Sequence, residues 1–531
     1  MSISGPLLSG NAKILAISDI HIGDNSRTCW YQSSVHERFL VAILDWASKQ
    51  PLITEVVLNG DIVDFWTYPF NYSPPSFSTI VAANPDLFAS NGAIPRLLDA
   101  KNGAVTYVEG NHDFGVTSPD ISSIMSLNGH KIKFAGSEYR LVTQDNKAIL
   151  FVHGHAFTMF NAPDRTTPWQ INPLPGIPSG LPVGHFITRM ISSKWSRDLP
   201  IDKTVADLAG QGAPNGLDLS AIINGIIKNA GDFSITQALL DSVAAQTGCG
   251  PTEPITLPFE LGTTTLANVR GIYANLWSDW VKATPGEQGE IRAAKAAVAD
   301  SNGKYLGWFA QMRAFEAVVD AVIMGHSHTP IKGLENSLTV YANSGFACPS
   351  VPDMGQQFIS FVLIDATDLS TQVLRITSPD RQGYLIDACP AIKTTVVMSP
   401  SEDFSCYVII DNSLGEALRF QSSEIGNGYF SVLPPDIIAP GSRAMIWLQD
   451  FPGICGSDAS FTYATDRKTF MFKVGCPTGF SSNSATSTGG VSFKSKYGRQ
   501  KKWGPKGVVE KWSPLHSLSD PMHPFFVWFT V

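Results

Sequence analysis

The amino-acid sequence predicts a mixed α/β domain that carries a helical insertion and is followed by an all-β sandwich. From residue 14 to 155, short β-type runs alternate with longer amphipathic stretches, which is typical of a sheet with helices on its faces. Helical patterns then dominate to about residue 318. After residue 395, short alternating runs are separated by Gly, Pro, Asn and Asp clusters, a spacing that indicates a β-sandwich. A chain of 531 residues is long enough for two or three domains.

Four apolar runs define the first part of the α/β domain: ILAIS at 14–18, EVVLN at 55–59, VTYVE at 105–109 and AILFV at 148–152. Between the first two, we expect a helix with one apolar face made of Phe39, Leu40, Ile43, Leu44 and Trp46. The β pattern resumes after the insertion, in AVVDAVIMG, LTVYANSG and QFISFVLIDA. We therefore expect one discontinuous domain at residues 1–385, with the helical insertion, interpreted as a cap, at 157–315.

Several stretches are expected to be irregular. Residues 157–182 hold six prolines, too many for regular structure. A turn-rich passage at 379–394 is interpreted as a linker, and residues 395–531 as a separate β-sandwich domain. The polar run SSNSATSTGG at 481–490 is expected to form a loop.

Composition limits the classes of function. The formal net charge of -8 gives the whole chain no general attraction to nucleic acid or to an anionic membrane. The N-terminal residues lack the pattern of a secretory signal, and no apolar run approaches the ~20 residues of a transmembrane segment. We expect a cytoplasmic protein, with export by a route without a cleaved signal as the alternative. The seven cysteines show no CxxC spacing, although Cys455 and Cys476 could pair in an exported protein.

Each strand-like run of the α/β domain ends in side chains that can bind a metal. They are Asp19 and His21; Asp61 and Asp64; Asn111, His112 and Asp113; His153 and His155; and His326 and His328. Ligand sites of open α/β sheets form at the carboxyl ends of the strands, so we expect these side chains to converge. In D-x-H and H-x-H, an extended backbone would direct both ligands to one side. The glycines that precede Asp61, Asn111 and His326 allow a close approach of the chain.

The ligand types indicate the metals and the chemistry. Imidazole, carboxylate and amide groups without thiolate favour Mn, Fe or Zn over Ca or Mg alone. Seven candidate ligands suit two divalent metal ions better than one. Two cations that share a carboxylate can activate water for the attack of hydroxide on phosphorus. A single block could be a chance match or a hydrogen-bonded core residue, but five blocks in order argue against that explanation.

The ordered blocks D-x-H, G-D-x-x-D, G-N-H-D, H-G-H and G-H-x-H resemble the calcineurin-like metallophosphoesterase superfamily, over about residues 13–160 and 315–378. The resemblance implies a four-layer α/β/β/α sandwich and a metal-dependent phosphoric ester hydrolase. It implies two ligand sets that share Asp61 as a bridge: Asp19, His21, Asp61 and His328, and Asp61, Asn111, His153 and His326. It also implies that His112 stabilises the transition state or protonates the leaving oxygen, and that Asp113 orients His112.

The motifs SDIHIG, NGDIVDFW and GNHDF are most similar to the UDP-2,3-diacylglucosamine pyrophosphohydrolase-like branch. Protein Ser/Thr phosphatases carry an Arg-Gly pair and a second Arg where this chain has Phe65, Trp66 and Glu109, which argues against that branch. The insertion is longer than in the pyrophosphohydrolase branch, so the acylated sugar nucleotide of that branch is not carried over as substrate. We expect hydrolysis of a phosphomonoester, phosphodiester or pyrophosphate bond.

Further candidate substrate residues lie in the insertion and beside the HGH block. His185, Arg189, Lys194 and Arg197 cluster in GHFITRMISSKWSRD and could bind a second phosphate or a head group. The alternative is a solvated helix face. His155 is a candidate for substrate contact, and both His155 and Asp64 could instead support the ligands or be polar loop residues.

Residues 407–477 resemble aegerolysin-like β-sandwiches, which bind membrane lipids and assist pore formation. The stretch FKSKYGRQKKWGPKGVVEKW beyond them interleaves basic and aromatic side chains. Such a stretch suits an anionic lipid surface, a single strand of nucleic acid or a solvated loop. These features favour a phospholipid or lipid-linked phosphate as substrate, with membrane-surface contact. The alternative function is a lipid-binding or pore-forming protein of aegerolysin type in which the phosphoesterase domain has a supporting role.

Overall fold

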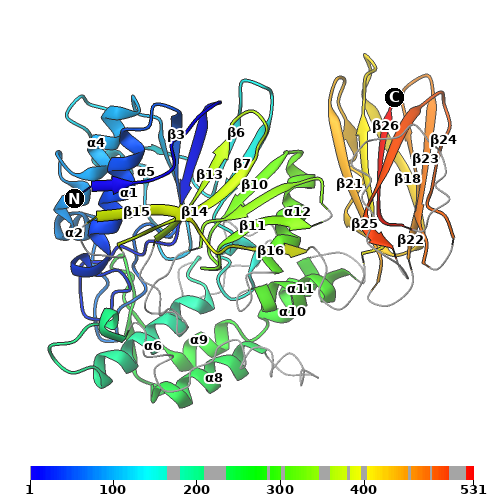
Figure 1. The fold of residues 1–531 in the computed structure, drawn as a ribbon. Coiled ribbons are helices and arrows are strands. Elements are labelled where there is room, and N and C mark those ends of the chain that lie inside the picture. The colour runs from blue at the N-terminus through cyan, green and yellow to red at the C-terminus, as the bar shows by residue number, and fades with distance from the viewer. Residues whose placement is uncertain are drawn as a thin grey trace. The chain divides into compact units, whose positions relative to one another are not determined.

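The computed structural model describes residues 2–163, 180–208, 235–283, 288–299, 305–335, 337–345, 359–378, 383–395, 403–451, 456–478, 481–501 and 522–531. The chain forms two compact units. The first unit holds Met1–Leu306, Ile323–Gly333 and Tyr341–Lys393, and the second holds Gly307–Val322, Leu334–Val340 and Thr394–Val531. The elements of each unit are labelled in Figure 1.

An eight-stranded mixed sheet runs through the first unit (Figure 1). Its order is β1 (Ser2–Ser4), β15 (Gly383–Ala388), β14 (Thr371–Thr377), β13 (Ile359–Asp365), β2 (Lys13–Ile17), β3 (Ile53–Asn59), β4 (Val105–Val108) and β5 (Lys133–Phe134). Strands β2 to β5 are parallel neighbours, and β13 pairs antiparallel with β2. The central strands are apolar along their length because they are buried on both faces. The predicted α/β architecture is confirmed.

Helices α1 (Arg38–Ser48) and α4 (Ala93–Ala100) pack against this sheet. The predicted apolar face of α1 is buried in one core cluster with side chains of the strands: Phe39, Leu40, Ile43, Leu44 and Trp46. Full burial of one such side chain contributes about 1.5–3 kcal/mol. This face therefore holds the helix on the sheet.

A second, six-stranded sheet has the order β16 (Ile392–Thr395), β11 (Ile331–Glu335), β12 (Val340–Asn343), β10 (Ala321–Met324), β7 (Ala148–Val152) and β6 (Glu138–Val142). Asn59, the last residue of β3, donates from its amide to the carbonyls of Val152 and Ile323. These bonds bring the carboxyl ends of β3, β7 and β10 together. The candidate site lies at this meeting point.

Strands β15 and β16 occupy the passage where a linker was expected. The turn-rich sequence hides an alternation, because Tyr384 and Ile386 are buried whereas Leu385 between them is exposed. The linker interpretation of this passage is wrong, because β15 lies between β1 and β14 in the eight-stranded sheet and β16 is the edge strand of the six-stranded sheet.

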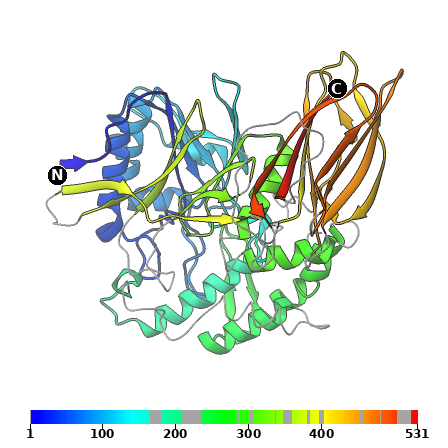
Figure 2. The ribbon, with the colours of Figure 1, turned by 45° about the vertical axis from the view of Figure 1, so that its right-hand side comes forward.

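The insertion is largely helical, as predicted. It contains α6 (Val183–Asp198), α8 (Ile235–Thr247), α9 (Leu266–Ile272), α10 (Leu276–Ala283) and α11 (Gln288–Ala299), together with the short hairpin β8 (Pro254–Thr256) and β9 (Thr263–Thr265). These helices lie together on one side of the first unit's sheets in both views (Figures 1 and 2). Most of the proline-rich stretch and residues 209–234 of the predicted insertion lie outside the described residues.

The second unit contains two five-stranded sheets. One has the order β19 (Tyr429–Val432), β21 (Arg443–Gln449), β17 (Cys406–Asp411), β26 (Met522–Thr530) and β25 (Ser492–Lys501). The other has β20 (Ile437–Ile438), β18 (Leu418–Asn427), β22 (Ser457–Ala464), β23 (Thr469–Cys476) and β24 (Ser484–Ser487). Side chains of both sheets form one core, which includes Ile446, Phe472 and Phe529. The predicted β-sandwich is therefore present.

Two local predictions in this part of the chain need correction. Helix α12 (Leu306–Ala317) begins inside the predicted insertion, but from Gly307 onward it belongs to the second unit. The Nε1 of Trp308 donates to Oε1 of Gln449 over 2.9 Å, which fixes this helix on β21. Strand β24 lies where a loop was expected, because Ala485 is buried against the sandwich core. Cys455, the expected partner of Cys476, lies outside the described residues.

Candidate metal centre and its surroundings

The predicted metal ligands gather where five strands end. Strands β2, β3, β4, β7 and β10 stop within a few residues of them. Potential ligand atoms form three groups in which all atoms lie within 4.8 Å of one another: Asp19, His21 and His328; His21, Asp61 and His112; and Asp61, His153 and His326. The main-chain N–H of His326 donates to Oδ1 of Asp19 over 2.7 Å, although the two residues are 307 positions apart.

Asp61 lies between two imidazoles. Its Oδ2 is 3.0 Å from Nε2 of His153 and 3.8 Å from Nε2 of His21. The other ring nitrogen of His153, Nδ1, lies 2.9 Å from the carbonyl oxygen of Asn59 and must carry a proton to bond there. In the neutral ring, Nε2 is then a lone pair that faces a carboxylate, and although burial lowers the pKa of His153, Asp61 and Asp19 raise it to about 9. A cation between the two groups would replace this repulsion with attraction, so these residues fit a metal ion.

His21 repeats the arrangement on the other side of Asp61. Its Nδ1 donates to Oδ2 of Asp64 over 3.0 Å, which leaves Nε2 bare in the neutral ring. This Nε2 lies 3.2 Å from Nε2 of His328, which in turn lies 3.8 Å from Oδ1 of Asp19. Nitrogen and carboxylate donors that face one another at these distances suit a divalent cation of the Mn, Fe or Zn type. The residues present therefore fit a cation on each side of Asp61.

The carboxylate of Asp64 also holds His112. Its Oδ2 lies 3.0 Å from Nδ1 of His112, while its Oδ1 accepts from two main-chain N–H groups of the following turn. Burial favours a higher pKa for Asp64, but His112 and His21 hold it below its usual range. Burial lowers the pKa of His112, but Asp64 and Asp61 raise it by more. Asp64 is fully buried, so the alternative of an exposed loop residue does not apply.

The hydrogen bonds of Asp113 do not include His112, which the family resemblance implies that it orients. Its Oδ2 accepts from the N–H of Ile62 and the hydroxyl of Tyr107, and its Oδ1 accepts from the N–H of Gly110. The physical reason is that the carboxylate of Asp113 bonds to the turn after β3 and to the turn after β4, and so joins these two turns. Burial and the nearby Asp61 raise the pKa of Asp113 to about 7.

The backbone at the ligands differs from the extended conformation expected for D-x-H and for H-x-H at 326–328. Five candidate ligands have positive φ angles: Asp19 (60°), His21 (57°), Asp61 (52°), His326 (68°) and His328 (53°). A residue held in the left-handed region costs about 1–3 kcal/mol, and such residues concentrate at functional sites. The expectation of extended backbone is wrong at these two blocks, because left-handed turns after the strands aim the ligands.

The glycines before the ligands allow the predicted close approach. Gly60 has a φ of 86°, and a Cβ there would stand 2.5 Å from the ring of His153. A Cβ on Gly110 would run into the carboxylate of Asp61. Larger residues at these positions would displace ligands on the neighbouring strand ends.

Two tryptophans border the histidine cluster. The ring of Trp66 stacks on His112 with centroids 4.3 Å apart and 29° between the planes. The ring centroid of Trp30 lies 4.7 Å from that of His21 and 4.9 Å from that of His112, and Trp30 is partly exposed. Neither was singled out as a site residue from the sequence. The only signal was their proximity to the D-x-H and G-D-x-x-D blocks.

Arg189, a candidate substrate residue, lies fully buried and bonds main-chain carbonyls. Its guanidinium donates to Thr256 at the end of β8 and to Pro69, Phe70 and Tyr72 in the loop after the G-D-x-x-D block. These bonds occupy its terminal nitrogens, so Arg189 ties α6 to the active-site side of the chain. The neighbouring basic residues are also engaged, since Lys194 pairs with Asp198 and Arg197 donates to the carbonyl of Thr247. Arg189 therefore matches neither prediction from the sequence, which were binding of a substrate group and exposure on a solvated helix face.

His185 lies against Trp66 and is not part of the three groups of potential ligands. Its ring meets the edge of Trp66 with centroids 5.4 Å apart, and it is fully buried. Burial, followed by the charge of Arg189, lowers its pKa well below the usual value, so the ring is neutral. His155 is also buried, with its ring 5.4 Å from His153 and 6.4 Å from His326.

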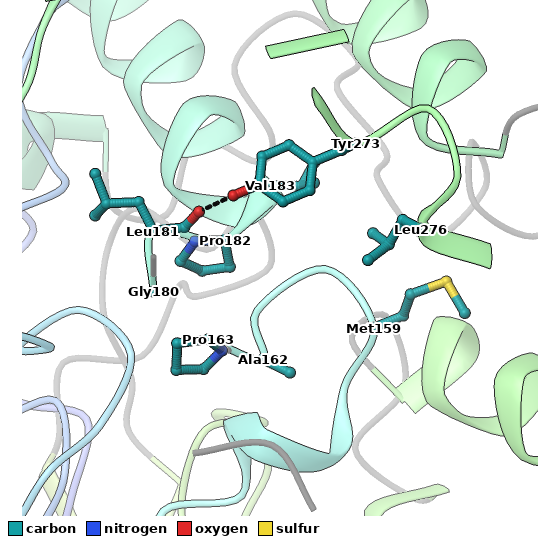
Figure 3. A pocket seen from close by; sticks show the side chains of 9 residues that line it. All are labelled: Met159, Ala162, Pro163, Gly180, Leu181, Pro182, Val183, Tyr273 and Leu276. Atoms are coloured by element: carbon teal, nitrogen blue, oxygen red, sulfur yellow. Dashed lines mark hydrogen bonds between the residues drawn. The ribbon is translucent and has the colours of Figure 1, made fainter. Parts of the chain in front are cut away.

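A small hollow of about 260 Å³ lies between the segment that follows β7 and the first cap residues. Figure 3 shows its lining, with the hydroxyl of Tyr273 donating to the carbonyl of Leu181 across one side. The lining residues are Met159, Ala162, Pro163, Gly180, Leu181, Pro182, Val183, Tyr273 and Leu276. Among the described residues that line this hollow, none has a charged side chain.

A mixed α/β fold with buried Asp, Asn and His side chains at its strand ends defines a metal-dependent hydrolase. Residues 12–207 match the family model of the calcineurin-like phosphoesterases. The chain therefore contains a calcineurin-like phosphoesterase domain and is a metal-dependent phosphoric ester hydrolase. The match does not reach His326 and His328, which only the fold brings to the site.

Similar solved structures are distant. A conserved uncharacterized protein of Streptococcus pneumoniae TIGR4, described as a predicted phosphoesterase, is 12% identical with a TM-score of 0.24; the match covers 72% of this chain and 100% of that one. The lipid binding protein Nakanori is 10% identical with a TM-score of 0.18, over 24% of this chain and 71% of that one. At these TM-scores neither likeness carries an argument. No curated protein matches the chain. Among the described residues, no helix has the length and apolarity needed to cross a membrane.

Proposed function

We propose that the chain hydrolyses a phosphoester at a centre of two divalent cations, Mn, Fe or Zn. One ion would be held by Asp19, His21, Asp61 and His328, and the other by Asp61, Asn111, His153 and His326. The observation that carries the proposal is the placement of two imidazoles, His21 and His153. The Nδ1 atoms of these rings are held by Asp64 and by the carbonyl of Asn59, so each Nε2 faces another metal-binding group, His328 at 3.2 Å and Asp61 at 3.0 Å.

The bound cations would supply positive charge that favours ionisation of an attacking water and stabilises the charge that grows on the phosphoryl oxygens. His112 is the proposed acid for the leaving oxygen. Asp64 holds its Nδ1–H, so Nε2 is the ring atom from which a proton can pass. The stacked ring of Trp66 limits rotation of the imidazole and keeps Nε2 aimed.

The proposed substrate is a phosphomonoester, phosphodiester or pyrophosphate whose leaving group has an apolar part. Trp30 supports this choice, because a partly exposed aromatic ring beside His112 can contact an apolar leaving group. A phospholipid or lipid-linked phosphate is one class that meets this description.

The alternative of a lipid-binding or pore-forming protein has less support. The described part of the basic and aromatic stretch includes Lys494 and Lys496, whose ammonium groups lie over the rings of Trp528 and Phe526 at 4.0 and 5.4 Å. Lys502, Trp503, Lys506 and Trp512 lie outside the described residues. The contacts of Lys494 and Lys496 are those of a stabilised sheet surface, and we propose the phosphoesterase function in preference to this alternative.

The test replaces the proposed acid. His112→Asn should keep its bound metal but lose turnover of bis-p-nitrophenyl phosphate by about 10²-fold or more, as expected for a lost general acid. Metal content is measured by mass spectrometry on the same preparation. His130→Asn is the matched control, because this half-buried histidine lies on the loop before β5, away from the cluster. Equal turnover of His112→Asn and wild type would remove His112 from the mechanism.

A further inference from the structure

Thr158 contacts the imidazole of the candidate ligand His326 at Nε2. It follows the short 3-10 helix His155–Phe157 after β7 and is fully buried. Its Oγ1 lies 2.9 Å from the carbonyl oxygen of His155 and 3.1 Å from Nε2 of His326. The hydroxyl thus bridges the loop after β7 and the loop after β10.

The two contacts leave one assignment of the hydrogens. A carbonyl oxygen can only accept, so the single hydroxyl hydrogen of Thr158 must point to His155. Toward His326 the hydroxyl then offers only a lone pair, and Nε2 of His326 must carry a hydrogen to complete that bond. In a neutral imidazole, a hydrogen on Nε2 leaves Nδ1 bare.

Nδ1 is the nitrogen of His326 that points into the site. It lies 3.1 Å from Oδ1 of Asn111, and His326 forms a potential ligand group with Asp61 and His153. An amide oxygen only accepts, so a bare Nδ1 and this oxygen both offer lone pairs, which a cation between them would bind. A hydrogen on Nδ1 would block a metal there, whereas the bare Nδ1 can bind one. Hydrogen bonds of this kind behind a metal ligand fix the tautomer and ring orientation.

We propose that Thr158 is a positioning residue that holds His326 in the tautomer that presents Nδ1 to the second cation. This inference rests on the proposed two-cation centre. It assigns a role to a residue outside the five sequence blocks, and it makes the segment after β7 part of the support of a ligand on β10.

The test is a titration of the full-length, metal-stripped chain with Mn²⁺ in a calorimeter. Thr158→Val keeps the side-chain shape but cannot accept from Nε2, so one of the two Mn²⁺ sites should lose affinity by about 10- to 100-fold while the other keeps its affinity. Thr158→Ser keeps the hydroxyl and should bind like the wild type. Thr247→Val is the matched control, because this buried hydroxyl bonds only carbonyls of its own helix α8.

The outcomes separate this inference from the proposed function. A wild type that binds fewer than two Mn²⁺ ions would contradict the two-cation centre itself. A wild type that binds two, with unchanged affinity in Thr158→Val, would overturn the role of Thr158 alone, as would a Ser variant as weak as Val. Circular dichroism checks each fold first. If Thr158→Val does not fold, Thr158→Ala takes its place with the same expected loss of affinity and the same contradicting result.

Discussion

The carboxylate of Asp64 supports two imidazoles with different proposed tasks. One of its oxygens lies 3.0 Å from Nδ1 of both His21 and His112. In the proposed centre, His21 would thereby be aimed at a cation and His112 at the leaving oxygen, so a single carboxylate would support both metal binding and proton transfer. Asp113 lies beside His112 in sequence, but its three hydrogen bonds join two loops.

We predict that Asp64→Asn mainly lowers kcat, whereas Asp113→Asn mainly lowers the free energy of unfolding. Asp64→Asn should lower kcat by about 10²-fold or more, because His112 loses the group that orients it. Asp113→Asn should keep most of its turnover per folded molecule but lose about 1–3 kcal/mol of unfolding free energy, because a buried acceptor becomes partly a donor. Steady-state kinetics and urea unfolding of both variants check this. Equal losses of kcat would contradict the division of roles.

A buried histidine far from the metal ligands gives a pH prediction. His36 precedes α1, and burial lowers its pKa from 6.5 to about 4. The folded chain therefore resists protonation of this ring, while the unfolded chain takes up a proton below pH 6.5. Stability from this group is complete above pH 6.5 and falls as the pH drops toward 4, by up to about 3 kcal/mol.

The measurement is urea unfolding of the wild type and of His36→Gln between pH 7 and 4. The variant lacks the titrating ring, so the difference in unfolding free energy between the two proteins should shift in favour of the variant as the pH falls. A difference that stays constant with pH would contradict the buried, neutral His36.

At the scale of residues, the sequence could supply ligand identity but not backbone conformation. The candidate ligands could be predicted because each follows an apolar run, and strand ends meet at one edge. The positive φ angles of Asp19, His21 and Asp61 could not be predicted, because Asp and His residues also occur in extended backbone and the sequence has no pattern that marks the left-handed conformation. Which carboxylate reaches His112 depends on the direction of a turn, and the family resemblance implied Asp113 instead of Asp64.

Among the elements, α6 is joined to the active-site side of the first unit by one buried cation. Arg189 donates to carbonyls of Pro69, Phe70 and Tyr72 and to Thr256 of β8. Burial lowers the pKa of Arg189 to about 9, which still leaves it charged at neutral pH. Helical spacing predicted the element, but the sequence alone could not tell a buried arginine from one that faces solvent.

We predict that Arg189→Met destabilises the first unit strongly. Several buried carbonyls would lose their donor, and each costs about 1–3 kcal/mol. The melting temperature should therefore fall by several degrees, more than for Lys194→Met. Lys194 pairs with Asp198 on the surface of the same helix, and such pairs contribute about 0–1 kcal/mol. Differential scanning calorimetry compares the variants, and equal melting temperatures would refute the structural role of Arg189.

At the scale of the whole molecule, alternation and turn signals predicted the order α/β, helical insertion and β-sandwich. They did not place α12, which from Gly307 belongs to the second unit because Trp308 and Phe315 contact β21 and β17. They also missed β15, which lies between β14 and the distant β1, and the edge strand β16, whose partner β11 is distant in the chain. Long-range contacts decide which unit or sheet an element belongs to, and a local sequence pattern does not contain that information.

The central claim is that side chains from five strand ends hold two cations around Asp61. Anomalous diffraction from crystals grown with Mn²⁺ tests it most directly. We predict two anomalous peaks, one among Asp19, His21 and His328 and one among Asp61, His153 and His326. The absence of both peaks, with the Asp61 carboxylate hydrogen-bonded only to protein, would contradict the claim.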